Sequence, residues 1–311
     1  MIVIKIGGGG GLDLAACLDD VARLRAEGRE IVVVHGGSGP ATELGEALGY
    51  PPQFITTPSG MRSRYTDART LEIFTMALAR FNTELVASLQ TKEVQAVGLS
   101  GVDGRVLEGR RKETVVAVED GRRRVIRDDR SGTVEGVNTG LLRTLLDAGY
   151  VPVLSPPAWS PDGPINVDGD RAAAQVARAL DAHTLVLLTN VPGLLRACDD
   201  EGSLIQRVGP ADWDEALLFA NGRMRIKLLA ARAALDGGVP RVVIADGRRE
   251  QPIIRALAGK GTVLGHEQPD PEGPWQGTNP EGSTKDLLHA ETFQGPVPAM
   301  RFQAQAPRER L

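Results

Sequence analysis

The sequence predicts an α/β protein: a three-layer α/β/α sandwich with a central, mainly parallel sheet. Short apolar runs alternate with helical patterns along most of the 311 residues, which is typical of a parallel sheet covered by helices on both faces. Two of these runs, residues 2–6 and 31–35, end directly in glycine-rich turns. Because ligands of open parallel sheets bind beyond the carboxyl ends of the strands, these turns are candidate binding loops.

The first half of the chain follows this order closely. After the first strand, helical spacing begins at Leu14 and ends near Gly28, and the second glycine turn leads into a helix over residues 41–48. Asp67 is a candidate N-cap for a long helix that reaches about Leu89. A strand over residues 94–99 follows. An Asp-Gly turn between two apolar runs then predicts a hairpin formed by residues 115–118 and 124–126.

The second half resumes the parallel order and ends in a different kind of segment. The expected elements are a helix over 137–148, a strand over 150–154, a short hairpin around 162–163, a helix from 171, a strand over 184–188, two helices, and strands over 241–245 and 262–264. Residues 266–311 are rich in Pro, Gly, Gln and Glu without an apolar period, so we expect a disordered tail.

Composition limits the class of function. The formal net charge is −4, which gives no support to nucleic-acid binding. Cys17 and Cys198 are the only two cysteines, which favours a reducing compartment over a disulfide scaffold. Met1 leads straight into a strand without a leader pattern, and no apolar stretch reaches membrane-spanning length. We therefore expect a cytoplasmic protein without a membrane partner.

The two glycine turns predict an anion site. Gly7 and Gly8 follow Lys5 in the first strand, and Gly36 and Gly37 follow the second. Glycine lets backbone N–H groups approach an anion closely, and a lysine between buried strand residues needs a charged partner. For each turn taken alone, a flexible turn is as good an explanation as an anion site, with Lys5 solvated on an edge strand. Together they favour a binding site.

Three further residues are candidates for a role in binding or catalysis, and each could instead have a purely structural role. Arg64 precedes a helix start, where it could clamp a carboxylate or belong to a solvated basic loop. Asp170 could orient a lysine or simply N-cap the next helix, and Lys227 could serve the site or lie on a helix surface. Asp168 and Asp170 have no neighbouring His or Cys, so we expect no metal site made by the protein alone. Walker, protein-kinase, Rossmann and nucleophile-elbow motifs are absent.

Six segments, taken in order, resemble the amino-acid kinase family, and most closely its acetylglutamate-kinase branch, over about residues 1–265: Lys5-Ile6-Gly7-Gly8, Val33-Val34-His35-Gly36-Gly37, Arg64-Tyr65-Thr66-Asp67, Ala96-Val97-Gly98-Leu99-Ser100-Gly101, Asn166-Val167-Asp168-Gly169-Asp170 and Gly222-Arg223-Met224-Arg225-Ile226-Lys227. Residues 59–67, 104–112 and 188–195 are most similar to the [LysW]-aminoadipate kinases within that branch. The departures are Phe81-Asn82-Thr83, where relatives commonly read Asn-Lys, the five glycines at 7–11, and the tail.

The resemblance implies ATP-dependent phosphorylation of a carboxylate to an acyl phosphate, with Mg²⁺ carried by the nucleotide. It gives catalytic roles to Lys5 on the transferring phosphoryl group, Lys227 on the nucleotide phosphates, and Asp170, which orients both lysines. It assigns phosphate binding to Gly7 and Gly8, and substrate binding to Gly36, Gly37, Arg64 and Asn166. It also implies a substrate lobe over about residues 1–170 and a nucleotide lobe over about 171–265.

The same resemblance implies α-aminoadipate, and possible use of glutamate, linked to an acidic amino-group carrier protein of the LysW type, and a homodimeric enzyme. Basic residues that could dock such a carrier crowd the region of the predicted hairpin: Arg110, Arg111, Lys112, Arg122, Arg123, Arg124, Arg127 and Arg130. An ordinary solvated hairpin is the alternative. The competing functions are a free N-acetylglutamate kinase and a non-catalytic nucleotide or amino-acid sensor. The intact set Lys5, Asp170 and Lys227 argues against a sensor.

Overall fold

The computed structural model describes residues 1–58, 60–119 and 121–265. The chain divides into two units, Met1–Pro274 and Trp275–Leu311, and the second lies wholly outside the described residues. The tail expected over 266–311 and the Asp120 of the predicted hairpin turn also lie outside them.

A nine-stranded sheet forms the centre of the described part of the chain, in the order β11-β10-β2-β1-β12-β14-β15-β13, with β5 paired to β10. The pairs are parallel except β10–β11 and β14–β15, which confirms the predicted fold class. The strands are β1 (Ile2–Ile6), β2 (Ile31–His35), β5 (Ala96–Gly101), β10 (Val151–Ala158), β11 (Ile165–Asn166), β12 (Thr184–Thr189), β13 (Arg207–Val208), β14 (Arg241–Asp246) and β15 (Thr262–Gly265).

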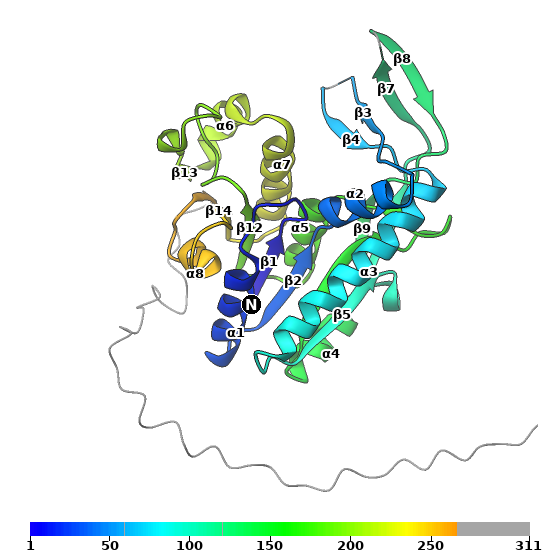
Figure 1. Ribbon diagram of the computed structural model, residues 1–311. Helices are drawn as coiled ribbons and strands as arrows, with labels where there is room; N and C mark the ends of the chain where they lie inside the picture. The colour runs from blue at the N-terminus through cyan, green and yellow to red at the C-terminus, as the bar shows by residue number, and fades with distance from the viewer. Residues whose placement is uncertain (59, 120, 266–311) are drawn as a thin grey trace, which may run out of the picture. The chain divides into compact units, whose positions relative to one another are not determined.

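Helices cover both faces of this sheet (Figure 1). Alternate residues of β1 point to opposite sides: Val3 packs into a core shared with α4, α5 and α7, whereas Ile4 packs into a second core shared with α1, α3 and α8. The helices are α1 (Leu14–Ala26), α2 (Ser38–Ala47), α3 (Ala68–Gln90), α4 (Thr139–Asp147), α5 (Gly169–Ala179), α6 (Trp213–Phe219), α7 (Gly222–Asp236) and α8 (Pro252–Leu257), with short 3₁₀ turns η1 (Asp103–Arg105), η2 (Glu201–Ser203) and η3 (Pro210–Asp212).

The register of the central strands positions the site. Lys5 on β1 pairs with Val34 on β2 and Leu187 on β12. These three parallel strands therefore end at the same edge of the sheet, and the loops that follow them converge there.

Two hairpins project together beside α2 and α3 (Figure 1). They are built from β3 (Phe54–Thr56) with β4 (Arg62–Arg64), and β7 (Val115–Glu119) with β8 (Arg122–Ile126). A small core formed by Ile55, Val115, Ala117 and Ile126 joins them. The predicted β7–β8 hairpin is confirmed. A further antiparallel pair, β6 (Leu107–Arg111) with β9 (Gly132–Val137), lies before α4.

Within the described ranges, none of the helices combines the length and apolarity that crossing a bilayer requires.

Candidate active site

A buried cluster of three charges lies at the carboxyl edge of the sheet. Asp170, in the first turn of α5, accepts hydrogen bonds from Lys227 of α7 through Oδ1 at 2.9 Å and Oδ2 at 3.1 Å. Lys5 Nζ, from β1, lies 2.9 Å from the same Oδ1. The three side chains are almost inaccessible, with each residue only 6–7% exposed. Lys5 and Lys227, which are 222 residues apart in the sequence, thus meet at one carboxylate.

This charge cluster, Lys5–Asp170–Lys227, combines two lysines with one carboxylate, and Asp168 nearby also acts on all three groups electrostatically. Burial opposes ionisation of Asp170, but the ammonium groups of Lys227 and Lys5 hold the pKa of that carboxyl well below its ordinary range. Burial lowers the pKa of Lys227, and Asp170 acts against this shift. A buried cluster of two ammonium groups and one carboxylate is suited to an anionic partner.

The alternative prediction that Asp170 caps α5 is wrong. Asp168 is the N-cap: its backbone is extended, and its Oδ1 accepts the backbone N–H of Arg171 at 2.9 Å. The helix begins at Gly169, two residues before the expected start. Asp170 is therefore free of a capping role and turns inward to the two lysines. The alternative that Lys227 lies on a helix surface is also wrong, since its side chain is buried.

The two glycine turns pack backbone against backbone beside this cluster. Gly36 donates its N–H to the carbonyl of Ile6 at 2.9 Å, and Gly39 donates to the carbonyl of Gly8 at 2.7 Å. A Cβ on Gly8 would lie 2.0 Å from the nitrogen of Gly37, so no larger residue fits there without moving a turn. Gly37 is also the N-cap residue of α2, so the N-terminus of this helix follows directly on the second glycine turn.

Arg64 lies against the start of α2, and Asn166 lies beside Thr66. Arg64 donates to the Ser38 carbonyl at 3.0 Å and to Thr42 Oγ1 at 2.8 Å. Burial, and then the charge of Arg223, lower the pKa of Arg64. Asn166 donates to Thr66 Oγ1 at 3.2 Å. Both side chains are half-buried.

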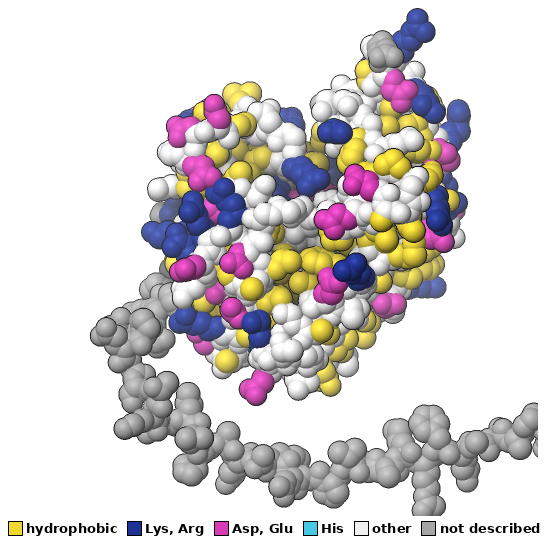
Figure 2. Space-filling view, in the orientation of Figure 1, with side chains coloured by type: hydrophobic (Ala, Val, Ile, Leu, Met, Phe, Trp, Pro, Cys, Tyr) yellow, Lys and Arg dark blue, Asp and Glu magenta, His cyan; other side chains and the backbone are white. Residues whose placement is uncertain are grey.

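Arg223 is a site residue that the sequence prediction missed. It is exposed at the start of α7, and its guanidinium lies 3.2 Å from where a Cβ on Gly9 would be. Together with its effect on Arg64, this places a cation from the C-terminal half beside the first glycine turn. The signal was available, because Arg223 stands inside the Gly222–Lys227 segment already singled out. Figure 2 shows a hollow in this face between the parts that carry α6 and β3–β4, with Lys or Arg side chains inside it.

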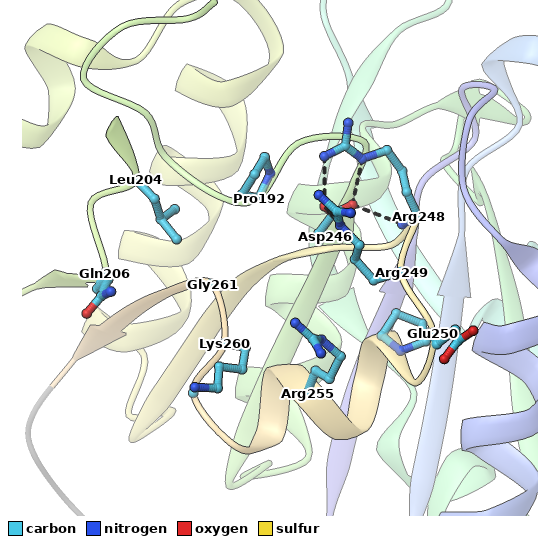
Figure 3. A pocket seen from close by; sticks show the side chains of 12 residues that line it. Pro192, Leu204, Gln206, Asp246, Arg248, Arg249, Glu250, Arg255, Lys260 and Gly261 are labelled. Carbon is cyan, nitrogen blue, oxygen red and sulfur yellow. Dashed lines mark hydrogen bonds and ion pairs between the residues drawn. The ribbon is translucent and has the colours of Figure 1, made fainter. Parts of the chain in front are cut away.

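A separate cavity of about 710 Å³ lies next to the loop between β14 and α8 (Figure 3). Its central arginines are already paired: Arg248 Nη2 lies 2.8 Å and Arg249 Nε 3.0 Å from Asp246 Oδ2. The three residues of the charge cluster are not among those that line it. This cavity is therefore separate from the charge cluster, although it borders the carboxyl ends of β12 and β14 at the same edge of the sheet.

Among residues 1–58, 60–119 and 121–265, His, Cys, Asp and Glu do not gather in a group of three or more that could hold a metal ion. The oxygens of Asp170 are already engaged by two ammonium groups. The donor set that is present, backbone N–H groups, lysines and arginines, fits the phosphates of a nucleotide.

Comparisons with known proteins agree with this geometry. [LysW]-aminoadipate kinase of Deinococcus radiodurans is 54% identical over 266 residues, covering 85% of this chain and 91% of that protein. [LysW]-aminoadipate kinase of Thermus thermophilus is 50% identical over 268 residues, covering 85% and 100%. [LysW]-aminoadipate/[LysW]-glutamate kinase of Saccharolobus solfataricus is 35% identical over 270 residues, covering 85% and 99%.

Among solved structures, N-acetylglutamate synthase from Neisseria gonorrhoeae has a TM-score of 0.68 at 28% identity, covering 86% of this chain, which spans only 59% of that longer chain. Isopentenyl phosphate kinase has a TM-score of 0.58 at 17% identity, covering 85% of this chain and 99% of that one, a likeness of fold alone. The model of the family described as "Amino acid kinase family" matches residues 1–246. The resemblance carried by the six segments is confirmed, and the chain belongs to the amino acid kinase family.

Proposed function

We propose that this protein uses ATP to phosphorylate the side-chain carboxylate of α-aminoadipate, linked to an acidic carrier protein, giving an acyl phosphate in lysine biosynthesis. Carrier-linked glutamate is a second possible acceptor, which would add arginine biosynthesis. The observation that carries the proposal is the buried Lys5–Asp170–Lys227 cluster beside two closely packed glycine turns. The 35–54% identity to kinases named for the LysW carrier supports the choice of substrate.

The chemistry explains the residues of the site. A substrate carboxylate is already ionised at neutral pH, with an ordinary pKa of about 4.3, so the enzyme needs no general base. Its task is to bring two anions together and to stabilise charge on the transferring phosphoryl group. Lys5 would contact that group and Lys227 the nucleotide phosphates. Asp170 would keep both ammonium groups charged and correctly placed, as its contacts at 2.9 Å allow.

The remaining assignments follow the position of each residue around the cluster. Gly7 and Gly8 would bind phosphate through their N–H groups. Gly36, Gly37, Arg64 and Asn166 would bind the acceptor on the other side. Mg²⁺ would enter with ATP, since the lysines already engage Asp170. We place the substrate lobe at about residues 1–170 and the nucleotide lobe at about 171–265.

The β7–β8 hairpin is the proposed docking surface for the carrier. Arg122, Arg123 and Arg124 are exposed along β8, and Arg124 lies 3.3 Å from Glu119. The hairpin projects from the substrate-lobe half (Figure 1). A basic, protruding strand can attract an acidic carrier without taking part in phosphoryl transfer.

The test compares two double charge reversals with the same change in charge. Arg122→Glu/Arg123→Glu alters the hairpin, and Arg255→Glu/Lys260→Glu alters exposed cations beside the separate cavity as the control. Exposed charge pairs contribute about 0.2–1 kcal/mol each, so the hairpin variant should raise KM for carrier-linked aminoadipate by roughly 2- to 30-fold at low salt. The effect should shrink in 0.5 M salt, and KM for ATP should stay unchanged.

Free N-acetylglutamate is assayed beside the carrier-linked substrate. Efficient phosphorylation of free N-acetylglutamate, without use of the carrier-linked substrate, would replace the proposal with an arginine-pathway kinase. Nucleotide binding without turnover on either substrate would favour the sensor. We also propose that the enzyme is a homodimer acting in the cytoplasm, and light scattering tests the assembly.

A further inference from the structure

The middle of α3 sends one buried amide toward the active-site edge of the sheet. Asn82 is 8% exposed, and its Nδ2 makes two contacts: the carbonyl oxygen of Val153 at 2.9 Å and Nε2 of His35 at 3.0 Å. A carbonyl oxygen only accepts hydrogen bonds, so the contact with Val153 fixes which end of the amide is the NH₂ group. Its second N–H must then donate to the His35 ring.

That donation fixes the protonation state of the histidine. Nε2 can accept only if it carries a lone pair, so His35 is neutral and its proton is on Nδ1. Nδ1 lies 2.9 Å from the carbonyl oxygen of Gly36, which again can only accept. Both contacts therefore require the same tautomer. The ring is fully buried, and the edge of Phe81 packs against it at 5.2 Å between centroids.

The electrostatic surroundings keep this tautomer neutral. Burial lowers the pKa of His35 to about 4, and the positive charge of nearby Lys5 acts in the same direction. At pH 7 the imidazole is thus a fixed dipole and not a proton acceptor for the substrate. Space for Asn82 comes from Gly98 on β5, where a Cβ would lie 1.9 Å from Asn82 Oδ1.

The end point of this chain of hydrogen bonds is a peptide of the second glycine turn. The carbonyl of Gly36 and the N–H of Gly37 belong to one planar trans peptide, so holding the oxygen fixes the direction of the N–H. We propose that Asn82 and His35 are positioning residues, which act through the Gly36 carbonyl to aim the Gly37 N–H at the reacting groups. The last step rests on the proposed function, because it requires phosphoryl transfer at this turn.

The tautomer is tested on the full chain without substrate, by NMR of the protein labelled with ¹³C,¹⁵N-histidine. Among the four histidines, His35 is identified by the signal that disappears in His35→Asn. We expect neutral, Nδ1-protonated His35 from pH 7.5 down to pH 5.5. An Nε2-protonated ring, or titration with a midpoint of 6 or above, would overturn the relay.

The kinetic test uses two side chains of similar size at position 35. His35→Asn keeps a short N–H donor next to the Gly36 carbonyl, and His35→Leu has none. If the donor positions the turn, kcat should fall by about 10- to 100-fold in His35→Leu, and His35→Asn should retain at least several-fold more activity. KM for ATP should change little in either variant. Equal kcat values in two folded variants would show that residue 35 only fills space.

Asn82→Asp gives an independent check, because a carboxylate has no N–H to donate to Nε2. The NMR signal should shift to an Nε2-protonated ring, which no longer donates to the Gly36 carbonyl, with a fall in kcat like that of His35→Leu. A doubly protonated ring keeps the Nδ1–H donor and should keep most of kcat. An unchanged Nδ1 tautomer in folded Asn82→Asp would contradict the assignment. If the wild type lacks kinase activity on all the substrates above, the proposed function fails, and the tautomer measurement still decides whether the hydrogen-bonded chain exists.

Discussion

Removing Lys227 and removing Asp170 should have different effects on stability, although both should abolish efficient catalysis. In Lys227→Met, Asp170 keeps Lys5 at 2.9 Å, so the net charge of the buried cluster falls from +1 to zero and no charge is left unpaired. The aliphatic replacement has nearly the length of lysine, and because Lys5 still pairs with Asp170, the cost should be smaller than that of leaving a buried charge unpaired. In Asp170→Asn the two ammonium groups face each other without a counter-charge, which costs about 3–5 kcal/mol.

These free energies convert to measurable melting temperatures. A protein of this size shifts by about 2–4 °C per kcal/mol, so Tm should fall by roughly 6–20 °C in Asp170→Asn and by a smaller amount in Lys227→Met. Loss of one preorganised charge should lower kcat by about 10²- to 10³-fold in both variants. Lys5→Met should behave like Lys227→Met. The control Lys260→Met removes an exposed lysine and should change neither quantity.

The pH dependence of Tm has a defined sign. Burial lowers the pKa of Lys227 in the folded protein, and loss of Asp170 lowers it further, so the unfolded chain binds more protons between that pKa and the ordinary value near 10.4. Stability therefore rises with pH in that window, and the Tm deficit of Asp170→Asn should be smaller at pH 9.5 than at pH 7. The reasoning is refuted if the Tm of Asp170→Asn equals that of the wild type, or if the kcat of Lys227→Met stays within fivefold of the wild-type value.

Two further predictions concern the first glycine turn and the cysteines. Gly8→Ala should lower kcat at least tenfold, because its Cβ would lie 2.0 Å from the Gly37 nitrogen. The control Gly10→Ala has open space around it, so it should keep wild-type kcat and change stability by no more than about 1 kcal/mol. Equal kcat values in the two variants would contradict the close packing of the turns. Cys17 is buried, and burial followed by the charge of Asp20 raises its thiol pKa to about 12, while Cys198 is exposed. Titration with a thiol reagent at pH 8 should therefore find one reactive thiol in the native protein and two after unfolding. Two reactive thiols in the native protein would contradict the burial of Cys17.

Much of the fold could be predicted because its signals are local. The apolar runs that form β1 and β2 end where the glycines begin, and Asp67 caps α3 by accepting the Thr70 N–H at 2.7 Å. The β3–β4 hairpin was missed, since its strands are three residues long and largely exposed. Such strands show no apolar alternation, and the neighbouring β7 that stabilises them lies far away in the sequence.

The site was only partly predictable for a related reason. Lys5 and the glycines are marked by their place at a strand end, but the choice between Asp168 and Asp170 as helix cap depends on one backbone angle. Asn82 was noted only as part of a departure from relatives. Its neighbour Thr83 is exposed and bonded to its own helix, so the departure lies on the outer face. The inward role of Asn82 depends on His35, 47 residues away.

The position of Lys5 shows why the three charged side chains of the cluster depend on one another. A lysine in a central strand with buried residues on both sides is stable only with a counter-charge, and Asp170 supplies it from α5. That carboxylate also opposes the loss of charge that burial imposes on Lys227. Asp170 contacts both lysines directly, and the carboxylate of Asp168, at the N-cap of α5, also acts on them electrostatically. Because ATP and the acceptor carboxylate of the proposed reaction are both anions, two lysines held at one edge of the sheet suit a complex in which these anions approach each other.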